Sequence, residues 1–269
     1  MSAGLRLAVT TLTVLPLRAH RVDRPAAGVA MAVAPLSGAG LGATLVVVLF
    51  GLRAAGTPAL VAAGVTVAAA ALLTRGLHLD GLADTVDALG SYRSGPAALD
   101  IMKKPDIGPF GVAAIALTLL IQTAALAALA DGWISDGPAE AAGGAAGGRI
   151  EGWTGGVAVV AAYAAGRLAA ALACRRGVPA ARRQGLGALV AGTVPTLVVV
   201  AACAIVAAGA RWAVPGRPWQ GPLADAVAVA VVLLLLRHAV RRFGGITGDV
   251  IGAAVEIATT VTLVALTLR

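Results

Sequence analysis

The chain has 269 residues, of which 59% are hydrophobic and 13% charged, with a mean hydropathy of +0.89, whereas soluble domains contain about 45–50% apolar and about 25% charged residues. The high hydrophobicity excludes a disordered chain, the lack of a strict glycine period excludes a collagen, and two cysteines are too few for a secreted disulfide scaffold. The formal charge of +8 comes from short Lys and Arg clusters between apolar stretches, which is typical of membrane topology, so we expect a lipid bilayer and no nucleic acid as partner.

The first stretch, Met1 to Pro16, carries a lone Arg6 and no small-residue cleavage site, so we expect it to lie at the membrane interface. Seven later stretches approach the about 20 apolar residues that a spanning helix needs. The sequence therefore predicts an all-α polytopic membrane bundle that forms a single domain over residues 1–269. The seven predicted spans are residues 28–52, 57–74, 107–130, 153–173, 189–210, 222–237 and 250–268.

The segments between these spans differ in charge. Residues 75–106 are rich in aspartate and are predicted to be the active-site loop. Residues 131–152 are glycine-rich and acidic, and their low-complexity part, residues 141–149, is predicted to be a flexible outer connection. With seven crossings and an inner N-terminus, fourteen cations face inward and five outward, so the positive-inside bias predicts a multi-pass plasma or inner membrane protein whose N-terminus and active site are cytoplasmic. The inner cations are Arg18, Arg21, Arg24, Arg75, Arg93, Lys103, Lys104, Arg175, Arg176, Arg182, Arg183, Arg237, Arg241 and Arg242.

The stretch 75-RGLHLDGLADTVDALGS-91 holds the most informative pattern. If it is helical, Asp80, Asp84 and Asp87 stand at i, i+4 and i+7 on one face. No lysine or arginine at the interleaved positions relieves their repulsion, but a divalent cation would. Carboxylate oxygens suit Mg²⁺ or Mn²⁺, so the three aspartates are predicted metal ligands, with a solvated acidic loop as the alternative.

A second acidic element lies at the other end of the chain. Asp249 and Glu256 are seven residues apart and share a helical face, with Gly252 between them leaving room for a ligand or a neighbouring backbone. Alternatively, Thr247 and Asp249 simply cap the last helix. Glu256 lies well inside an apolar helix, where an ionisable residue indicates a functional site.

Three further residues complete the candidate site. His78 would point away from the aspartate face of a continuous helix, or lie in the preceding turn and bind substrate or a carboxylate. Arg167 and Arg182 are candidates for contact with an anion, because the guanidinium fork matches phosphate geometry. An acidic cluster that could hold metal, with arginines on the same membrane face, indicates phosphoryl transfer.

These residues resemble the cobalamin synthase family, the adenosylcobinamide-GDP ribazoletransferases, over most of the chain. The family signature His-x-Asp-Gly-Leu-Ala-Asp-x-x-Asp stands here at residues 78–87. The other matching motifs are Met102, Lys103, Gly108 and Gly111; Ala181, Arg182, Gly185, Leu186 and Gly187; and Gly244, Gly245, Thr247, Gly248, Asp249, Gly252, Ala253 and Glu256. One departure concerns charge: the family's usual Asp is Lys104 here, and its second Arg is Asp106, whose carboxylate either enters the same pocket or is dispensable.

The resemblance implies an enzyme that joins α-ribazole, or its 5′-phosphate, to adenosylcobinamide-GDP with Mg²⁺ and releases GMP. Under this hypothesis Asp80, Asp84 and Asp87 hold Mg²⁺ against the diphosphate, Lys103 and Arg182 neutralise it, and Asp87 or Asp249 takes the hydroxyl proton. The expected catalytic residues are Asp84, Asp87 and Asp249, and the expected substrate-binding residues are His78, Lys103, Arg167, Arg182, Thr247 and Glu256. The sequence leaves open whether the chain forms a homo-oligomer.

Two alternative functions fit parts of the pattern. A CDP-alcohol phosphotransferase has a similar aspartate spacing, but its Ala-Arg after the second Asp is absent, since Asp84 follows Ala83 here. In a transporter, Asp80, Asp84 and Glu256 would be proton or cation relays at mid-membrane. Depth distinguishes these alternatives, because an enzyme site is expected at the rim of the bilayer.

Overall fold

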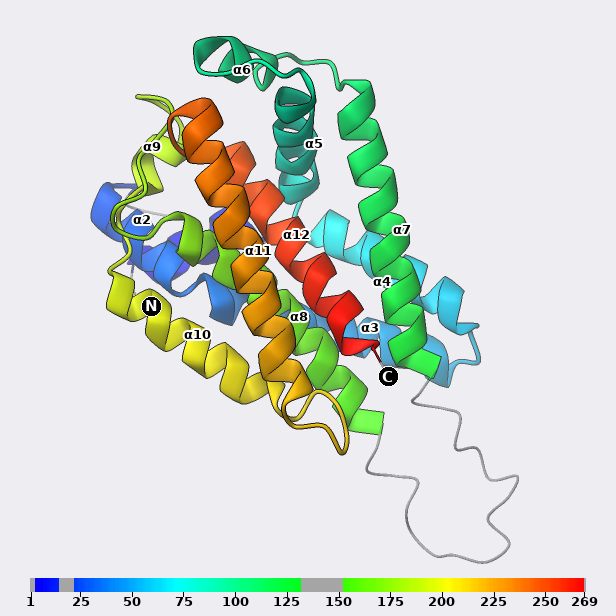
Figure 1. Ribbon diagram of the computed structural model, residues 1–269. Coiled ribbons are helices and arrows are strands. Elements are labelled where there is room, and N and C mark those ends of the chain that lie inside the picture. The colour runs from blue at the N-terminus through cyan, green and yellow to red at the C-terminus, as the bar shows by residue number, and fades with distance from the viewer. Residues whose placement is uncertain (1–2, 15–21, 132–151, 269) are drawn as a thin grey trace, which may run out of the picture.

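The computed structural model describes residues 3–14, 22–131 and 152–268. Over these ranges the chain folds into twelve helices, with two isolated bridges and no strand (Figure 1). The helices are α1 Ala3–Leu12, α2 Arg24–Ala32, α3 Ala34–Ala54, α4 Ala59–Leu73, α5 Leu77–Gly90, α6 Pro96–Ile101, α7 Pro109–Asp131, α8 Gly152–Ala173, α9 Leu186–Val190, α10 Thr196–Ala210, α11 Gln220–Phe243 and α12 Gly248–Leu266.

Five of the described helices, α3, α7, α8, α11 and α12, are long and apolar enough to cross a membrane. The pair α4 and α5 passes the same test together but is bent by 88°, so the described residues provide up to six spans. The expected all-α polytopic membrane protein is therefore confirmed, whereas the expected count of seven spans is not.

Two predicted spans form helices that are shorter than expected, for local reasons. The stretch 57–74 ends at a turn in which Arg75 and Gly76 adopt φ values of 56° and 65°, a left-handed conformation that cannot continue a helix. The stretch 189–210 is interrupted by Gly192, with φ of 69°, and by Pro195 at the N-cap of α10. The 15 residues of α10 rise only about 22 Å, less than the about 30 Å of a bilayer core.

The expected active-site loop is mostly helical. Within residues 75–106, α5 carries all three aspartates of the signature and α6 comes after a short turn. The expected flexible connection at 141–149 lies outside the described residues. The helical arrangement considered for the aspartates is the one that the structure adopts.

The N-terminal helix α1 lies against the break between α4 and α5. The backbone N–H of Val14 donates to the carbonyl of Leu73 at 2.9 Å, and the Arg75 guanidinium donates to the Thr10 carbonyl at 3.2 Å. Leu7 and Ala8 of α1 are buried in the main core. Helix α1 therefore packs on the bundle, while its expected position at a membrane interface stays a prediction.

The centre of the bundle is α8, which packs against α3 and α12 (Figure 1). In its apolar window, 89% of the residues are buried, the largest share among the candidate spans. Close approach depends on glycine: a Cβ at Gly42 of α3 would lie 2.8 Å from Cα of Val160 in α8. Small residues at helix contacts are the usual means of packing membrane helices tightly.

The contact that positions the candidate site is between α5 and α12. A Cβ built on Gly81 would lie 2.7 Å from the Asp249 carbonyl oxygen and 2.9 Å from its Cα. A Cβ built on Gly252 would lie 3.2 Å from Cα of His78 and 3.3 Å from Cα of Gly81. The space beside Gly252 is thus filled by a neighbouring backbone, one of the two occupants that the sequence left open.

Several chain segments meet at one end of the bundle, which we call the aspartate end. Here the N–H of Gly95, before α6, donates to the carbonyl of Arg242 in α11 at 2.7 Å, and α7 and α12 begin nearby (Figure 1). At the opposite end, Arg53 of α3 lies 3.6 Å from Asp131 of α7. The carboxylates of α5 and of the start of α12 therefore lie together at one end of the molecule.

We predict that Gly81→Ala lowers the free energy of unfolding by about 1–3 kcal/mol, because the added methyl meets backbone atoms of α12 that cannot move without separating the helices. Thermal unfolding in a single detergent measures this loss. The matched control is Gly40→Ala in α3, where a Cβ has nothing within 4 Å and alanine favours the helix by up to about 1 kcal/mol. Equal stability of the two variants would contradict the close α5–α12 contact.

Candidate active site

Two cavities open at the aspartate end, and α5 lines both. The first, which we call the glycine-lined cavity, has a volume of about 210 Å³. The second, the acidic cavity, has about 240 Å³. The glycine-lined cavity contains Asp80, Arg182, Gly185, Gly187, Thr247, Gly248, Asp249 and Gly252 among its lining residues. The acidic cavity is lined by Asp84, Asp87, Ser91, Ile101, Lys104, Asp106, Gly108, Pro109 and Phe110.

Asp84 connects the two sets of residues electrostatically. Its carboxylate is repelled by Asp249 and Asp80 of the glycine-lined cavity and by Asp87 of the acidic cavity, and it is attracted by Arg182. The charges of Asp80 and Asp87 both act on Asp84, but the three signature aspartates face two cavities, with Asp80 in one and Asp84 and Asp87 in the other. The structure adds Asp249 to this group through the α5–α12 contact.

Asp87 is fixed by the start of α7. Its Oδ2 accepts a hydrogen bond from the N–H of Gly108 at 2.7 Å, and its Oδ1 accepts one from the N–H of Gly111 at 2.9 Å. Gly108 directly precedes α7 and Gly111 lies in its first turn, where N–H groups lack helical partners and favour an anion. A Cβ on either glycine would collide with the carboxylate. This explains the spacing of Gly108 and Gly111, to which the sequence motif assigned no role.

Arg182 joins three segments at the glycine-lined cavity. Its Nη2 donates to the carbonyl of Leu99 in α6 at 2.8 Å, and its Nη1 lies 3.9 Å from Oδ2 of Asp249. Both side chains of this ion pair are about a quarter exposed, at 26% and 24%. Arg182 therefore places a partly accessible cation next to the carboxylates, and its expected contact with a substrate anion stays a prediction.

Thr247 acts as the N-cap of α12. Its hydroxyl accepts a hydrogen bond from the N–H of Val250 at 3.2 Å. The side chain is buried but also lines the glycine-lined cavity. The capping alternative therefore describes Thr247, whereas Asp249 lies in the first turn of α12 and faces Arg182.

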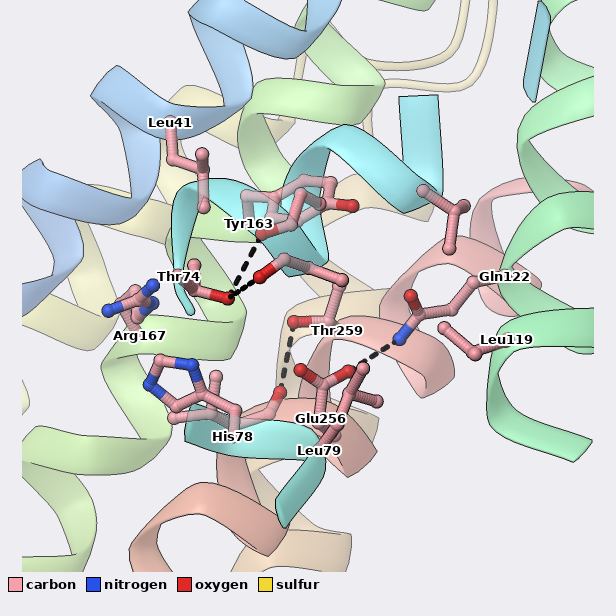
Figure 2. A pocket seen from close by; sticks show the side chains of 14 residues that line it. Leu41, Thr74, His78, Leu79, Leu119, Gln122, Tyr163, Arg167, Glu256 and Thr259 are labelled. Atoms are coloured by element: carbon pink, nitrogen blue, oxygen red, sulfur yellow. Dashed lines mark hydrogen bonds between the residues drawn. The ribbon is translucent and has the colours of Figure 1, made fainter. Parts of the chain in front are cut away.

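Below the carboxylates, a cluster of buried polar side chains surrounds a cavity of about 20 Å³ in the bundle interior (Figure 2). His78 and Arg167 are only 4% and 2% exposed. Gln122 of α7 donates to Oε2 of Glu256 at 2.9 Å and to the Thr260 hydroxyl at 3.0 Å. The cluster links α5, α7, α8 and α12 through polar groups, which are costly inside a membrane unless paired.

The expected substrate-binding residues thus lie at two depths, some in the bundle interior and some at the aspartate end. His78 lines both the interior cavity and the glycine-lined cavity, whereas Arg167 and Glu256 line only the interior cavity. Gln122 and Tyr163, which the sequence reasoning missed, belong to the same interior cluster. The signal for Gln122 was present, since an amide in the middle of an apolar stretch needs a partner.

Two adjacent lysines have different environments. The Lys103 ammonium lies 3.4 Å from Oδ1 of Asp100, both side chains are exposed, and Lys103 lines neither cavity at the aspartate end. Lys104 and Asp106 both line the acidic cavity with Asp84 and Asp87. The two positions at which this chain exchanges charges relative to the family pattern therefore lie in the same cavity, and the Asp106 carboxylate is on its wall.

The carboxylate oxygens are suitable ligands for a divalent cation, but the described side chains do not form a complete coordination site. Among the described residues, no group of three or more His, Cys, Asp or Glu side chains is arranged to hold a metal ion. Mg²⁺ usually takes one or two carboxylates and completes its shell with water and substrate phosphates. Asp84 with either neighbouring aspartate of α5 supplies that donor set.

Comparison with known proteins shows similarity over nearly the whole chain. Residues 4–267 match the family described as cobalamin-5-phosphate synthase. A protein named adenosylcobinamide-GDP ribazoletransferase from Frankia casuarinae is 40% identical, with 98% of this chain and 94% of the relative covered. Proteins of the same name from a Nocardioides species and from Corynebacterium efficiens are 40% and 35% identical, with 98% of this chain and 98% and 90% of the relatives covered. No solved structure matches the chain.

We predict that Asp87→Ala speeds amide hydrogen exchange at Gly108 and Gly111 by about tenfold or more, because a hydrogen bond to a charged acceptor contributes about 1.5–3 kcal/mol. Exchange measured by mass spectrometry over peptides that contain these amides tests this. Asp100→Ala is the control, since it removes an exposed carboxylate from the same end of the bundle. Unchanged exchange in Asp87→Ala would mean that the carboxylate does not hold the start of α7.

Proposed function

The chain belongs to the cobalamin-5-phosphate synthase family, and we propose that its aspartate end catalyses the transfer of α-ribazole, or its 5′-phosphate, onto adenosylcobinamide-GDP. The products are GMP and adenosylcobalamin or its 5′-phosphate. One observation carries the assignment: carboxylates from α5 and α12 interact with one another between two cavities, so that two substrates have a common reacting centre. This arrangement suits a displacement at phosphorus, in which the protein mainly positions groups and neutralises charge.

In this reaction a hydroxyl oxygen of the acceptor attacks the phosphorus next to the cobinamide moiety. A new phosphorus–oxygen ester bond forms, the diphosphate linkage breaks, and GMP leaves with the bridging oxygen. Arg182 is suited to the diphosphate, because it is the cation that interacts with both Asp84 and Asp249. Its fork can contact two phosphate oxygens at once.

We assign to Asp249 the role of general base, which accepts the proton of the attacking hydroxyl group of the acceptor. Both oxygens of Asp87, the other candidate, already accept hydrogen bonds from Gly108 and Gly111, so that Asp87 is held in place. Asp249 has one ion-pair contact at 3.9 Å and is 24% exposed toward the glycine-lined cavity. A general base must reach the proton that it accepts, and Asp249 has the accessible position.

Mg²⁺ is part of the proposal. Asp84, with Asp80 or Asp87, would hold the ion, which would neutralise developing charge on the phosphate oxygens. The support is the donor set, since the Asp84 carboxylate is repelled by Asp249, Asp80 and Asp87 and attracted by Arg182. His78 is the candidate for substrate contact at the floor of the glycine-lined cavity. Arg167 and Glu256 are proposed to act indirectly, by holding α5, α8 and α12 in register from the interior.

The proposed location is the plasma or inner membrane, with the aspartate end in the cytoplasm. The described cations that support this orientation lie next to helix ends at the aspartate end and outnumber those at the other end, as the positive-inside pattern requires. They are Arg93, Lys103, Lys104, Arg175, Arg176, Arg182, Arg183, Arg241 and Arg242. A transporter would instead place its aspartates at mid-membrane, whereas here they line cavities at a bundle end.

We predict that the purified protein in liposomes, given adenosylcobinamide-GDP, α-ribazole 5′-phosphate and Mg²⁺, releases GMP, and that Asp84→Asn lowers the rate by about 100-fold or more because it removes charge at the reacting centre. Liquid chromatography of GMP measures both rates. The control is Asp131→Asn, an exposed aspartate at the opposite end. Absence of GMP release from the wild-type protein would favour transport, and full magnesium-dependent turnover by Asp84→Asn would overturn the assignment of the site.

A further inference from the structure

We propose that the interior cavity binds one water molecule, and that this water connects the hydroxyl of Tyr163 in α8 to the carboxylate of Glu256 in α12. The water site lies below the aspartate end and is independent of the proposed function. It gives a role to Tyr163, a residue that none of the sequence motifs contains.

The size of the interior cavity is the first observation. Its volume is about 20 Å³, and a single water molecule needs a cavity of about 10–15 Å³. There is therefore room for one water. A phosphate, a nucleotide or an acyl chain needs far more space, so the volume alone excludes a substrate group or a lipid as the ligand.

The lining of the cavity is polar enough to hold a water. Side chains that donate or accept hydrogen bonds reach it from α5, α7, α8 and α12 (Figure 2). They include His78, Gln122, Glu256 and Thr259. A buried water typically makes two to four hydrogen bonds, whereas a cavity lined by apolar side chains stays dry. The cavity therefore offers enough partners for one water.

The hydroxyl of Tyr163 is the group that needs this water. Tyr163 is only 7% exposed and lines the cavity. Its hydroxyl oxygen is buried, and it has no hydrogen-bond partner among the residues that the structure describes. A buried hydroxyl without a partner is destabilising, and the lipid around a membrane bundle cannot supply one. A water in the cavity is the partner that remains available.

Glu256 is suited to accept the second hydrogen bond. Its Oε2 accepts one from Nε2 of Gln122 at 2.9 Å, and a carboxylate has the capacity for further bonds. The charge of Glu256 acts on the Tyr163 hydroxyl, so the two groups are near each other. The water would accept a hydrogen bond from the hydroxyl and donate one to the carboxylate. Both groups would then be paired without direct contact between them.

Water can reach the interior cavity without crossing lipid. His78 lines both the interior cavity and the glycine-lined cavity, and the latter opens at the aspartate end. One side chain is therefore common to the two cavities. Once bound, the water extends the polar cluster: Glu256 of α12 is linked to α7 directly by Gln122 and to α8 through the water.

The sign of a stability change tests the site. Tyr163→Phe removes the hydroxyl and keeps the ring. If the water is bound, this change should lower the midpoint of thermal unfolding in a single detergent by about 2–4 °C, because the water loses a partner. If the hydroxyl is unpaired in the folded protein, its removal should leave the midpoint unchanged or raise it.

The matched control is Thr85→Val in α5. The Thr85 hydroxyl is also buried without a hydrogen-bond partner among the described residues, but Thr85 lines none of the three cavities described above. Valine has nearly the same shape as threonine, so that Thr85→Val removes an unpaired hydroxyl away from the proposed water. Its midpoint should therefore not fall.

A structure at a resolution that shows ordered water gives the direct readout. Density for one water is expected in the interior cavity of the wild-type protein, within hydrogen-bond distance of the Tyr163 hydroxyl and the Glu256 carboxylate. An unchanged or higher midpoint in Tyr163→Phe, an equal fall in Thr85→Val, or a cavity without this density would overturn the water site. None of these outcomes depends on GMP release, which tests the proposed function separately.

Discussion

The close contact between the backbones of α5 and α12 is the constraint on which the candidate site depends. Gly81 and Gly252 have no side chains, so that the two helices approach until a Cβ on Gly81 would lie 2.9 Å from Cα of Asp249 and one on Gly252 3.2 Å from Cα of His78. Attraction between apolar side chains does not favour this contact in a bilayer as it would in water, and close packing of small residues takes its place. The contact brings Asp249 to the aspartates of α5, which are more than 150 residues earlier in the chain.

This gathering of carboxylates is costly by itself, and the surrounding structure offsets part of the cost. Arg182 faces Asp249, and the amides of Gly108 and Gly111 hold Asp87 at the start of α7. The remaining repulsion is suited to a divalent cation with substrate phosphates, which would complete a shell that the protein leaves open. Deeper in the bundle, Gln122 and Glu256 join α7 to α12 through a hydrogen bond, so that the helices carrying the site are held below it as well.

Residues 75–106 were expected to be a loop, and a helix was only one condition under which the signature aspartates would share a face. The structure meets that condition, because Asp80, Asp84 and Asp87 all lie on α5. The apolar pattern ends at residue 74, where α4 also ends, but it could not show the left-handed turn at Arg75 and Gly76 or the 88° bend between α4 and α5. It also could not distinguish Lys103 from Lys104, since their environments depend on the turn after α6 and on where α7 begins.

A double-mutant cycle on divalent-cation affinity tests most directly whether α5 and α12 form one site. Mn²⁺ binding would be followed by electron paramagnetic resonance in wild-type protein, Asp84→Asn, Asp249→Asn and the double variant. If the two carboxylates belong to one site, each single change weakens Mn²⁺ binding and the effects are coupled by about 0.5 kcal/mol or more. Unchanged affinity in Asp249→Asn, or losses that simply add, would show that the two helices do not share a site.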